Sequence, residues 1–168
     1  MTPRFLIAAL ALAAALPLSA CGLRPLYSGG ASGAVAQSLS GIEVAPIEGK
    51  AGWLVRTALE DRLPHGGPVR YKLQIKLDDA IQGFGVRAND TVTRERRTLR
   101  ARYQLVDSAT GTQILDATAG SDAGIDVVSS EYATIAAEDR ALENLSQTIA
   151  DQIVARLATF AAKEEAAK

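Results

Sequence analysis

The residues best suited to ligand binding in this sequence are arginines concentrated in one short segment. They are Arg87, Arg94, Arg96, Arg97, Arg100 and Arg102. Because side chains of an extended chain alternate between two faces, the even-numbered members of this group would share one face. A row of guanidinium groups, which stay charged and donate forked hydrogen bonds, suits phosphate or carboxylate ligands. A solvated strand face that discourages edge pairing is an equally good interpretation of the same row.

A second cationic stretch precedes the arginines. In "VRYKLQIKLDD", apolar residues alternate with Arg70, Lys72 and Lys76, which is typical of a strand with one buried and one polar face. Two neighbouring strands of this kind would give the sheet a cationic outer surface. The predicted ligand-binding residues are Arg94, Arg96, Arg100, Arg102, Arg70 and Lys72.

The single cysteine, Cys21, belongs to a different motif. Residues 1–20 combine a short cationic start with an apolar run, the pattern of a secretion signal. Leu18-Ser19-Ala20-Cys21 resembles the bacterial lipobox, whose cysteine receives a diacylglyceryl group and becomes the acylated N-terminus. A lone cysteine has no partner for a disulfide within the chain. We therefore predict that residues 1–20 are a lipoprotein signal peptide and that Cys21 is lipidated; the alternative is an ordinary signal peptide with an incidental cysteine.

Lipidation would decide how the protein is held at a membrane. The apolar run is shorter than the roughly 20 residues of a membrane-spanning helix, and Pro17 interrupts it. A single acyl chain anchors only marginally, whereas two or more hold stably, because each buried methylene contributes about 0.8 kcal/mol. Gly22, rather than Asp, follows the cysteine, which favours the outer membrane.

Residue types that support catalysis are scarce. The one histidine, His65, lies in the turn-like "PHGGP", and without a second His or another Cys we expect no metal site and no cofactor. Ser129 and Ser130 have no base and orienting acid nearby in the sequence, so we expect that the protein is not an enzyme. The charge is nearly balanced, with 18 Lys plus Arg and 19 Asp plus Glu, which argues against nucleic acid as a partner.

The periodicity of the remaining segments predicts the elements that would position these residues. We expect a short strand near 42–46, a helix from about 50 to 63 that buries Trp53 or Leu54, and strands over 69–79 and 90–107. A glycine-rich connection separates the latter two strands, and a fourth strand lies within 113–128. A long helix follows, capped by Ser129 or Ser130, with Tyr132, Ile135 and Ala136 at the start of its buried face.

The order strand, helix, three strands, helix predicts an α+β fold. Its simplest form is a two-layer sandwich, with two helices packed on one face of a four-stranded, mainly antiparallel sheet. We expect residues 21–40 to be a lipidated N-terminus and flexible tether, 41–162 to be a single domain, and 163–168 to be a polar C-terminal tail.

Several segments together resemble one family. They are "CGLRPLY" after the lipobox, the helix end "ALEDRL", the strands "YKLQIKL" and "TRERRTLRARYQLVD", and "SSEYATIAAEDRALENLSQTIADQIVARL". This set is similar to the lipopolysaccharide-assembly lipoprotein LptE, in its alphaproteobacterial form. The resemblance covers essentially the whole chain after the signal peptide.

The resemblance implies an outer-membrane lipoprotein that faces the periplasm and lies as a plug inside the β-barrel protein LptD. It also implies binding of lipopolysaccharide, without a cofactor or catalysis, while the lipid is inserted into the outer leaflet. The phosphates of lipopolysaccharide could pair with Arg96, Arg100 and Arg102. The alternative is a free-standing periplasmic lipoprotein that binds an anionic ligand or a cell-envelope polymer.

Overall fold

The computed structural model describes residues 33–86 and 92–167, so the predicted signal peptide and Cys21 lie outside the described residues. The elements are α2 (Ala34–Ser40), β1 (Ile42–Val44), α3 (Gly49–Glu60), β2 (Tyr71–Val86), β3 (Val92–Asp107), β4 (Gln113–Asp126) and α4 (Glu131–Ala166). Within the described ranges, no helix combines the length and the apolar character needed to cross a membrane.

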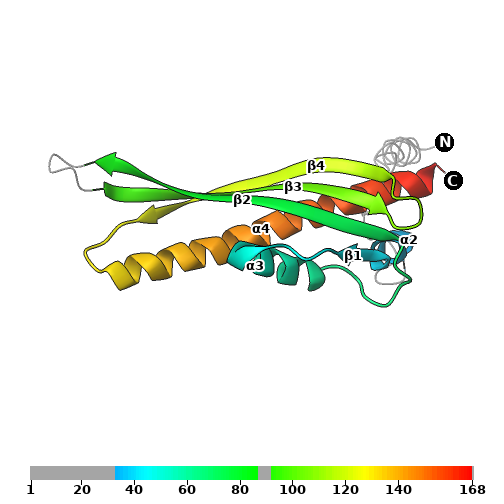
Figure 1. The fold of residues 1–168 in the computed structure, drawn as a ribbon, viewed down its shortest axis with the longest axis horizontal. Coiled ribbons are helices and arrows are strands. Elements are labelled where there is room, and N and C mark those ends of the chain that lie inside the picture. The colour runs from blue at the N-terminus through cyan, green and yellow to red at the C-terminus, as the bar shows by residue number, and fades with distance from the viewer. Residues whose placement is uncertain (1–32, 87–91, 168) are drawn as a thin grey trace, which may run out of the picture.

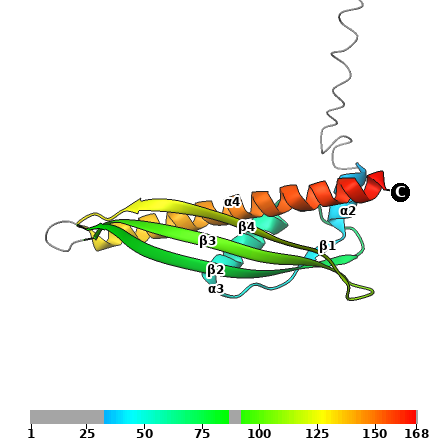
Figure 2. The ribbon, with the colours of Figure 1, turned by 90° about the horizontal axis from the view of Figure 1, so that it is seen from above.

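The strands form one mixed sheet in the order β1-β2-β3-β4. β1 runs parallel to β2 at one edge, whereas β2, β3 and β4 pair antiparallel. α4 runs along the length of the sheet, with α3 beside it, so the helices cover only one face (Figures 1 and 2). The predicted α+β two-layer sandwich is confirmed.

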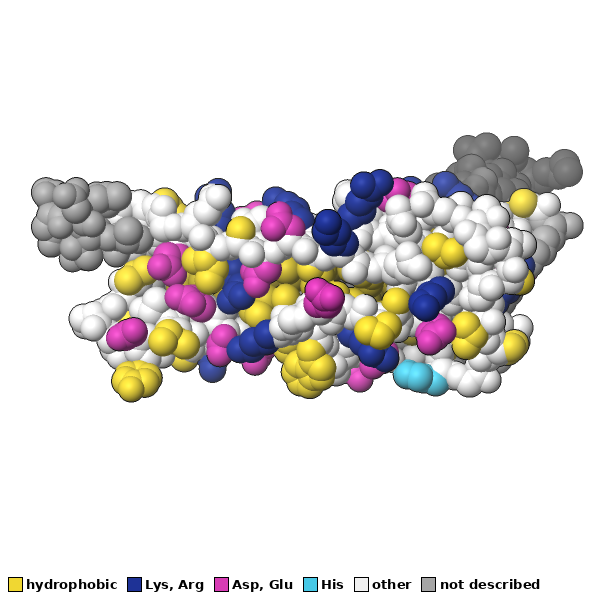
Figure 3. Space-filling model, viewed as in Figure 1, with side chains coloured by type: hydrophobic (Ala, Val, Ile, Leu, Met, Phe, Trp, Pro, Cys, Tyr) yellow, Lys and Arg dark blue, Asp and Glu magenta, His cyan; other side chains and the backbone are white. Residues whose placement is uncertain are grey.

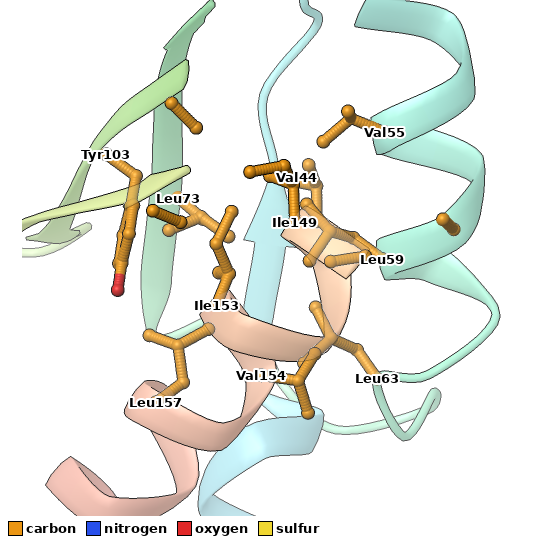
Figure 4. Close-up of a cluster of buried hydrophobic side chains, with 14 of the residues drawn as sticks. Val44, Val55, Leu59, Leu63, Leu73, Tyr103, Ile149, Ile153, Val154 and Leu157 are labelled. Atoms are coloured by element: carbon orange, nitrogen blue, oxygen red, sulfur yellow. The ribbon is translucent and has the colours of Figure 1, made fainter. Parts of the chain in front are cut away.

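The hydrophobic core lies between the sheet and these helices. Figure 4 shows Leu73 and Tyr103 from the sheet beside Ile153 and Leu157 of α4, with Val55 and Leu59 on α3. The buried residues of β2 and β3 are all odd-numbered, and since successive side chains of a strand alternate between its faces, the even-numbered residues between them point away from the core. Full burial of one such aliphatic side chain contributes roughly 1.5–3 kcal/mol. Burial of the apolar face of each strand therefore determines which residues form its outward face.

The segment predicted as a flexible tether is ordered in its last part. Residues 34–40 form α2, and its Ala36 and Leu39 are buried at 5% and 1% exposure. α2 packs against α4, so these apolar side chains join the domain core. In the structure, the packed body therefore includes α2, ahead of the predicted boundary at residue 41.

The segment predicted as a glycine-rich connection, residues 80–90, is strand as far as Val86, and the rest of it lies outside the described residues. β2 continues to Val86, and its register with β3 is regular from Tyr71 to Phe84. Gly85 then takes a φ of +76°, a conformation that side-chain-bearing residues rarely adopt, and it is skipped in the pairing. The glycines here accommodate an irregularity within a long hairpin.

The exposed positions of the helices also differ from the prediction. Tyr132 and Ile135 are 88% and 48% exposed, because α3 lies beside the middle of α4 and not beside its first turns (Figure 1). Trp53 is 65% exposed on α3, whereas Leu54 is half-buried. At the other end, α4 continues to Ala166, where Tyr71 donates a hydrogen bond to Glu164 (3.3 Å), so the predicted polar tail is mostly helix.

Ser130 precedes α4 at the N-cap position, but its side chain makes no cap hydrogen bond. Its carbonyl oxygen instead accepts hydrogen bonds from the backbone N–H groups of Ala133 and Thr134.

Arg97 lies on the inner face of the sheet, unlike the even-numbered arginines. Its guanidinium donates to both carboxylate oxygens of Asp79, at 2.8 and 2.6 Å, and to the carbonyl oxygen of Glu138 on α4, at 3.0 Å. The Arg97 side chain is only 11% exposed, and this hydrogen bonding to Asp79 raises its pKa above the ordinary value. Arg97 thus connects β2, β3 and α4.

We predict that Arg97→Met destabilises the fold by about 1–3 kcal/mol, because Asp79 and the Glu138 carbonyl lose a largely desolvated donor while the aliphatic packing is kept. Urea unfolding measures the difference. The matched control is Arg94→Met, which breaks an exposed ion pair and should cost less than about 1 kcal/mol. Equal losses in the two variants would contradict a special role for Arg97.

Candidate functional site

The outer face of the sheet, which no helix covers, holds the predicted cationic row. Arg94, Arg96, Arg100 and Arg102 are all exposed on this face of β3. They alternate with the buried Leu99, Ala101, Tyr103 and Leu105, as the sequence predicted. Lys72 lies on the same face of β2, and Arg70 precedes that strand, with its guanidinium 5.0 Å from the centre of the Tyr71 ring. Figure 3 shows lysines and arginines on the sheet side and also on the helix side, with apolar side chains visible between the sheet and the helices.

β4 places carboxylates beside this row that the sequence patterns did not predict. Asp126 is directly opposite Arg94, and the Arg94 Nε lies 3.1 Å from an Asp126 oxygen. Asp116 lies diagonally from Arg102 and accepts two hydrogen bonds from it, at 2.8 and 3.2 Å. The aspartates of "DATAGSDAGID" all have even numbers, so they lie on one face of this strand. The sequence alone does not indicate whether that face is the one that carries the arginines.

A further pair and a ring contact involve Arg96. Its Nε lies 4.0 Å from an Asp122 oxygen, and its guanidinium lies 5.4 Å from the centre of the Phe84 ring. These exposed interactions are individually weak, at most about 1 kcal/mol each. Their consequence is that three of the predicted ligand-binding arginines already have partners within the sheet.

The Arg102–Asp116 pair has the clearest electrostatic effect. The hydrogen bond from Arg102, followed by one from Gln104, lowers the pKa of Asp116 below its ordinary value. The same hydrogen bond raises the pKa of Arg102. Both groups therefore remain charged at neutral pH, and the positive charge of Arg102 is largely offset.

Other outer-face cations remain without a carboxylate. Among the residues that the structure describes, none places a carboxylate oxygen within 4.0 Å of Lys72, Lys76 or Arg100. Lys76 and Arg100 line a depression of about 560 Å³ in the middle of the sheet. Its other outer-face residues are Asp78, Arg102, Thr118 and Gly120.

Gly120 and Gln152 shape the β4 side of this depression. A Cβ atom on Gly120 would lie 2.5 Å from Nη1 of Arg100 and 2.7 Å from its Cδ, so the arginine side chain lies directly over the glycine. From α4, Gln152 accepts a hydrogen bond from the Gly120 N–H (3.1 Å) and donates one to its carbonyl oxygen (3.3 Å). The amide of Gln152 thereby occupies the open edge of β4 at this residue.

The described residues contain no group of three or more His, Cys, Asp or Glu side chains that could hold a metal ion. His65 is exposed in the connection between α3 and β2, at the surface in Figure 3. Ser129 and Ser130 are exposed immediately before α4.

Comparisons with known proteins agree with this architecture. The model of the family described as "LptE: Lipopolysaccharide-assembly" matches residues 39–157. No curated protein sequence matches the chain significantly.

Among solved structures, the chain is similar to a protein from Caulobacter crescentus CB15 described as a putative lipoprotein, with 29% identity and a TM-score of 0.63 over 76% of this chain and 96% of that one. It also shares its fold with rare lipoprotein B from Shewanella oneidensis, at 10% identity and a TM-score of 0.58 over 74% and 96% of the two chains. A minor lipoprotein from Acinetobacter baumannii matches at 12% identity and a TM-score of 0.56 over 71% and 92%.

We predict that Arg102→Gln raises the pKa of Asp116 toward its ordinary value, because the main cause of the depression is removed. A depressed folded-state pKa adds stability above the unfolded-state pKa, and this is lost as the pH falls through the folded-state value. Carboxyl ¹³C shifts followed by NMR from neutral to acidic pH measure the pKa. Arg94→Gln is the control and should leave Asp116 unchanged, since Arg94 pairs with Asp126. An unaltered Asp116 titration in Arg102→Gln would contradict the assignment.

Proposed function

The chain belongs to the LptE family of lipopolysaccharide-assembly proteins, and from this premise we propose that it is an outer-membrane lipoprotein that plugs an LptD-like β-barrel and binds lipopolysaccharide during its insertion. Membership in this family makes it a non-enzymatic component of lipopolysaccharide assembly. The match over residues 39–157, which spans α3, the whole sheet and most of α4, is the observation that carries the proposal.

The charge arrangement of the outer sheet face supports enclosure within a barrel. The lumen of a large outer-membrane barrel is polar. A face whose arginines pair with aspartates of the adjacent strand can enter such a lumen without leaving many charges desolvated and unpaired. The cations that lack a carboxylate remain available for the anionic groups of lipopolysaccharide.

The position of the described N-terminus supports anchoring at one end of the domain. α2 lies beside the C-terminal turns of α4, whereas the β2–β3 hairpin lies at the opposite end (Figures 1 and 2). An extended chain from Cys21 to the start of α2 would reach at most about 45 Å. An acylated Cys21 would therefore hold the α2 end close to the membrane and leave the body of the domain in the periplasm. The solved relatives described as lipoproteins are consistent with such an anchor.

We predict that Cys21→Ala releases the protein from the membrane, because the acyl acceptor is lost. Fractionation of the envelope and mass spectrometry of the native N-terminus measure this. Ser19→Ala is the matched control and should remain acylated, since it keeps a small side chain before the cysteine. Recovery of a wild-type N-terminus without acyl groups would refute the anchor.

We expect the full-length chain, tagged at its C-terminus and extracted from outer membranes in mild detergent, to purify with a large β-barrel protein in a stable complex. Size-exclusion chromatography followed by mass spectrometry identifies the partner. Purification of the wild-type chain by itself would reject the plug and favour a free-standing lipoprotein that binds an anionic ligand.

A further inference from the structure

We propose that the depression in the middle of the outer sheet face is a binding site for a single phosphate monoester group, and that Gly120 positions one of its ligands, Arg100. The site is named here the waist site and consists of Lys76, Arg100, Arg102, Thr118 and Gly120. The proposal rests on the proposed function only for the source of that phosphate, which would be a lipid headgroup.

The cross-strand register brings the donors of the waist site together. Lys76, Arg102 and Thr118 are direct neighbours in one row across β2, β3 and β4. Arg100 and Gly120 are neighbours in the next row. Directly opposite residues of antiparallel strands have Cβ atoms about 5 Å apart, so side chains from both rows can reach one small anion.

The charge state of these donors favours an anionic ligand. Lys76 and Arg100 have no ion-pair partner among the described residues, whereas Arg102 uses Nε and Nη2 for Asp116 and keeps Nη1 free of that carboxylate. Thr118 adds a hydroxyl group that can donate. Two uncompensated cations and neutral donors match a phosphate monoester, which offers three acceptor oxygens and up to two negative charges.

Gly120 determines where the Arg100 guanidinium lies. A methyl group at this position would overlap Nη1 and Cδ of Arg100, at 2.5 and 2.7 Å, so alanine would displace the whole outer half of the side chain. The strand itself cannot yield easily, because Gln152 holds both the N–H and the carbonyl group of Gly120. Gly120 is therefore a positioning residue and makes no charged contact of its own.

One charge opposes the ligand. Asp78 is directly opposite Arg100 on β2 and lines the same depression, but the ion pairs found among the described residues do not include these two. Its carboxylate would repel a phosphate held by Lys76 and Arg100. This predicts that neutralising Asp78 strengthens anion binding, an effect opposite in sign to that of removing either cation.

The test uses the full-length chain in a neutral detergent at low ionic strength, titrated with inorganic phosphate and, separately, with dihexanoylphosphatidic acid. Backbone and arginine side-chain ¹⁵N shifts report binding. We expect Gly120→Ala and Arg100→Gln each to weaken binding about tenfold, as loss of a charge-assisted contact would, and Asp78→Asn to strengthen it severalfold.

The matched control is Gly124→Ala. Gly124 lies on the same strand, also opposite an arginine, but a Cβ there would meet no atom within 4 Å, so binding should not change. Dihexanoylphosphatidylcholine, which lacks the monoester, should not shift the waist-site signals.

The two probes distinguish recognition of phosphate itself from recognition of a lipid headgroup. Shifts at Arg100 and Thr118 with both probes support a site that reads phosphate itself, and shifts with dihexanoylphosphatidic acid alone support a lipid headgroup as the source. Equal affinities of wild type and Gly120→Ala, or no shift with either probe, would overturn the proposal. Copurification with a barrel is independent of this measurement, so a barrel complex without phosphate binding defeats the waist site alone.

Discussion

The structure depends on burial of one face of β2 and β3 against α4. Leu73, Leu99, Tyr103 and Leu105 are each at most 2% exposed, so a register shift by one residue would bring charged side chains into the core. This apolar contact therefore fixes the direction of every even-numbered side chain on both strands. The arginine-bearing face is a consequence of core packing, whatever it binds.

Once the arginines are committed to one uncovered face, their mutual repulsion must be offset within that face. β4 does this with aspartates at its own outward positions, one directly opposite Arg94 and others diagonal to Arg96 and Arg102. In the middle of β4, the outward residues are instead Thr118 and Gly120, which carry no charge. Ion pairs with β4 aspartates are therefore formed by Arg94, Arg96 and Arg102, whereas no described residue places a carboxylate within ion-pairing distance of Lys76 or Arg100.

Local patterns in the sequence were sufficient for some of these features and insufficient for others. Strict alternation in β2 and β3 predicted the facing of the arginines, and the three- and four-residue spacing predicted most of the buried stripe of α4. α2 was missed because two buried side chains in a small-residue segment give no visible period, and their burial depends on α4, more than a hundred residues later. The charge balance of the outer face was missed for a similar reason: it depends on the register of β4 with β3, which the small residues of β4 leave undetermined until the strands are paired.

Gly120 and Gln152 give the waist site a shape that the rest of the outer sheet face does not share. A glycine within a strand weakens it, and an unpaired strand edge invites other chains. Here the glycine provides the space over which Arg100 lies, and the amide of Gln152 closes the edge at the same residue. Gly120 lies on β4 and Gln152 on α4, and both line the depression beside Arg100. No described residue places a carboxylate within ion-pairing distance of that arginine.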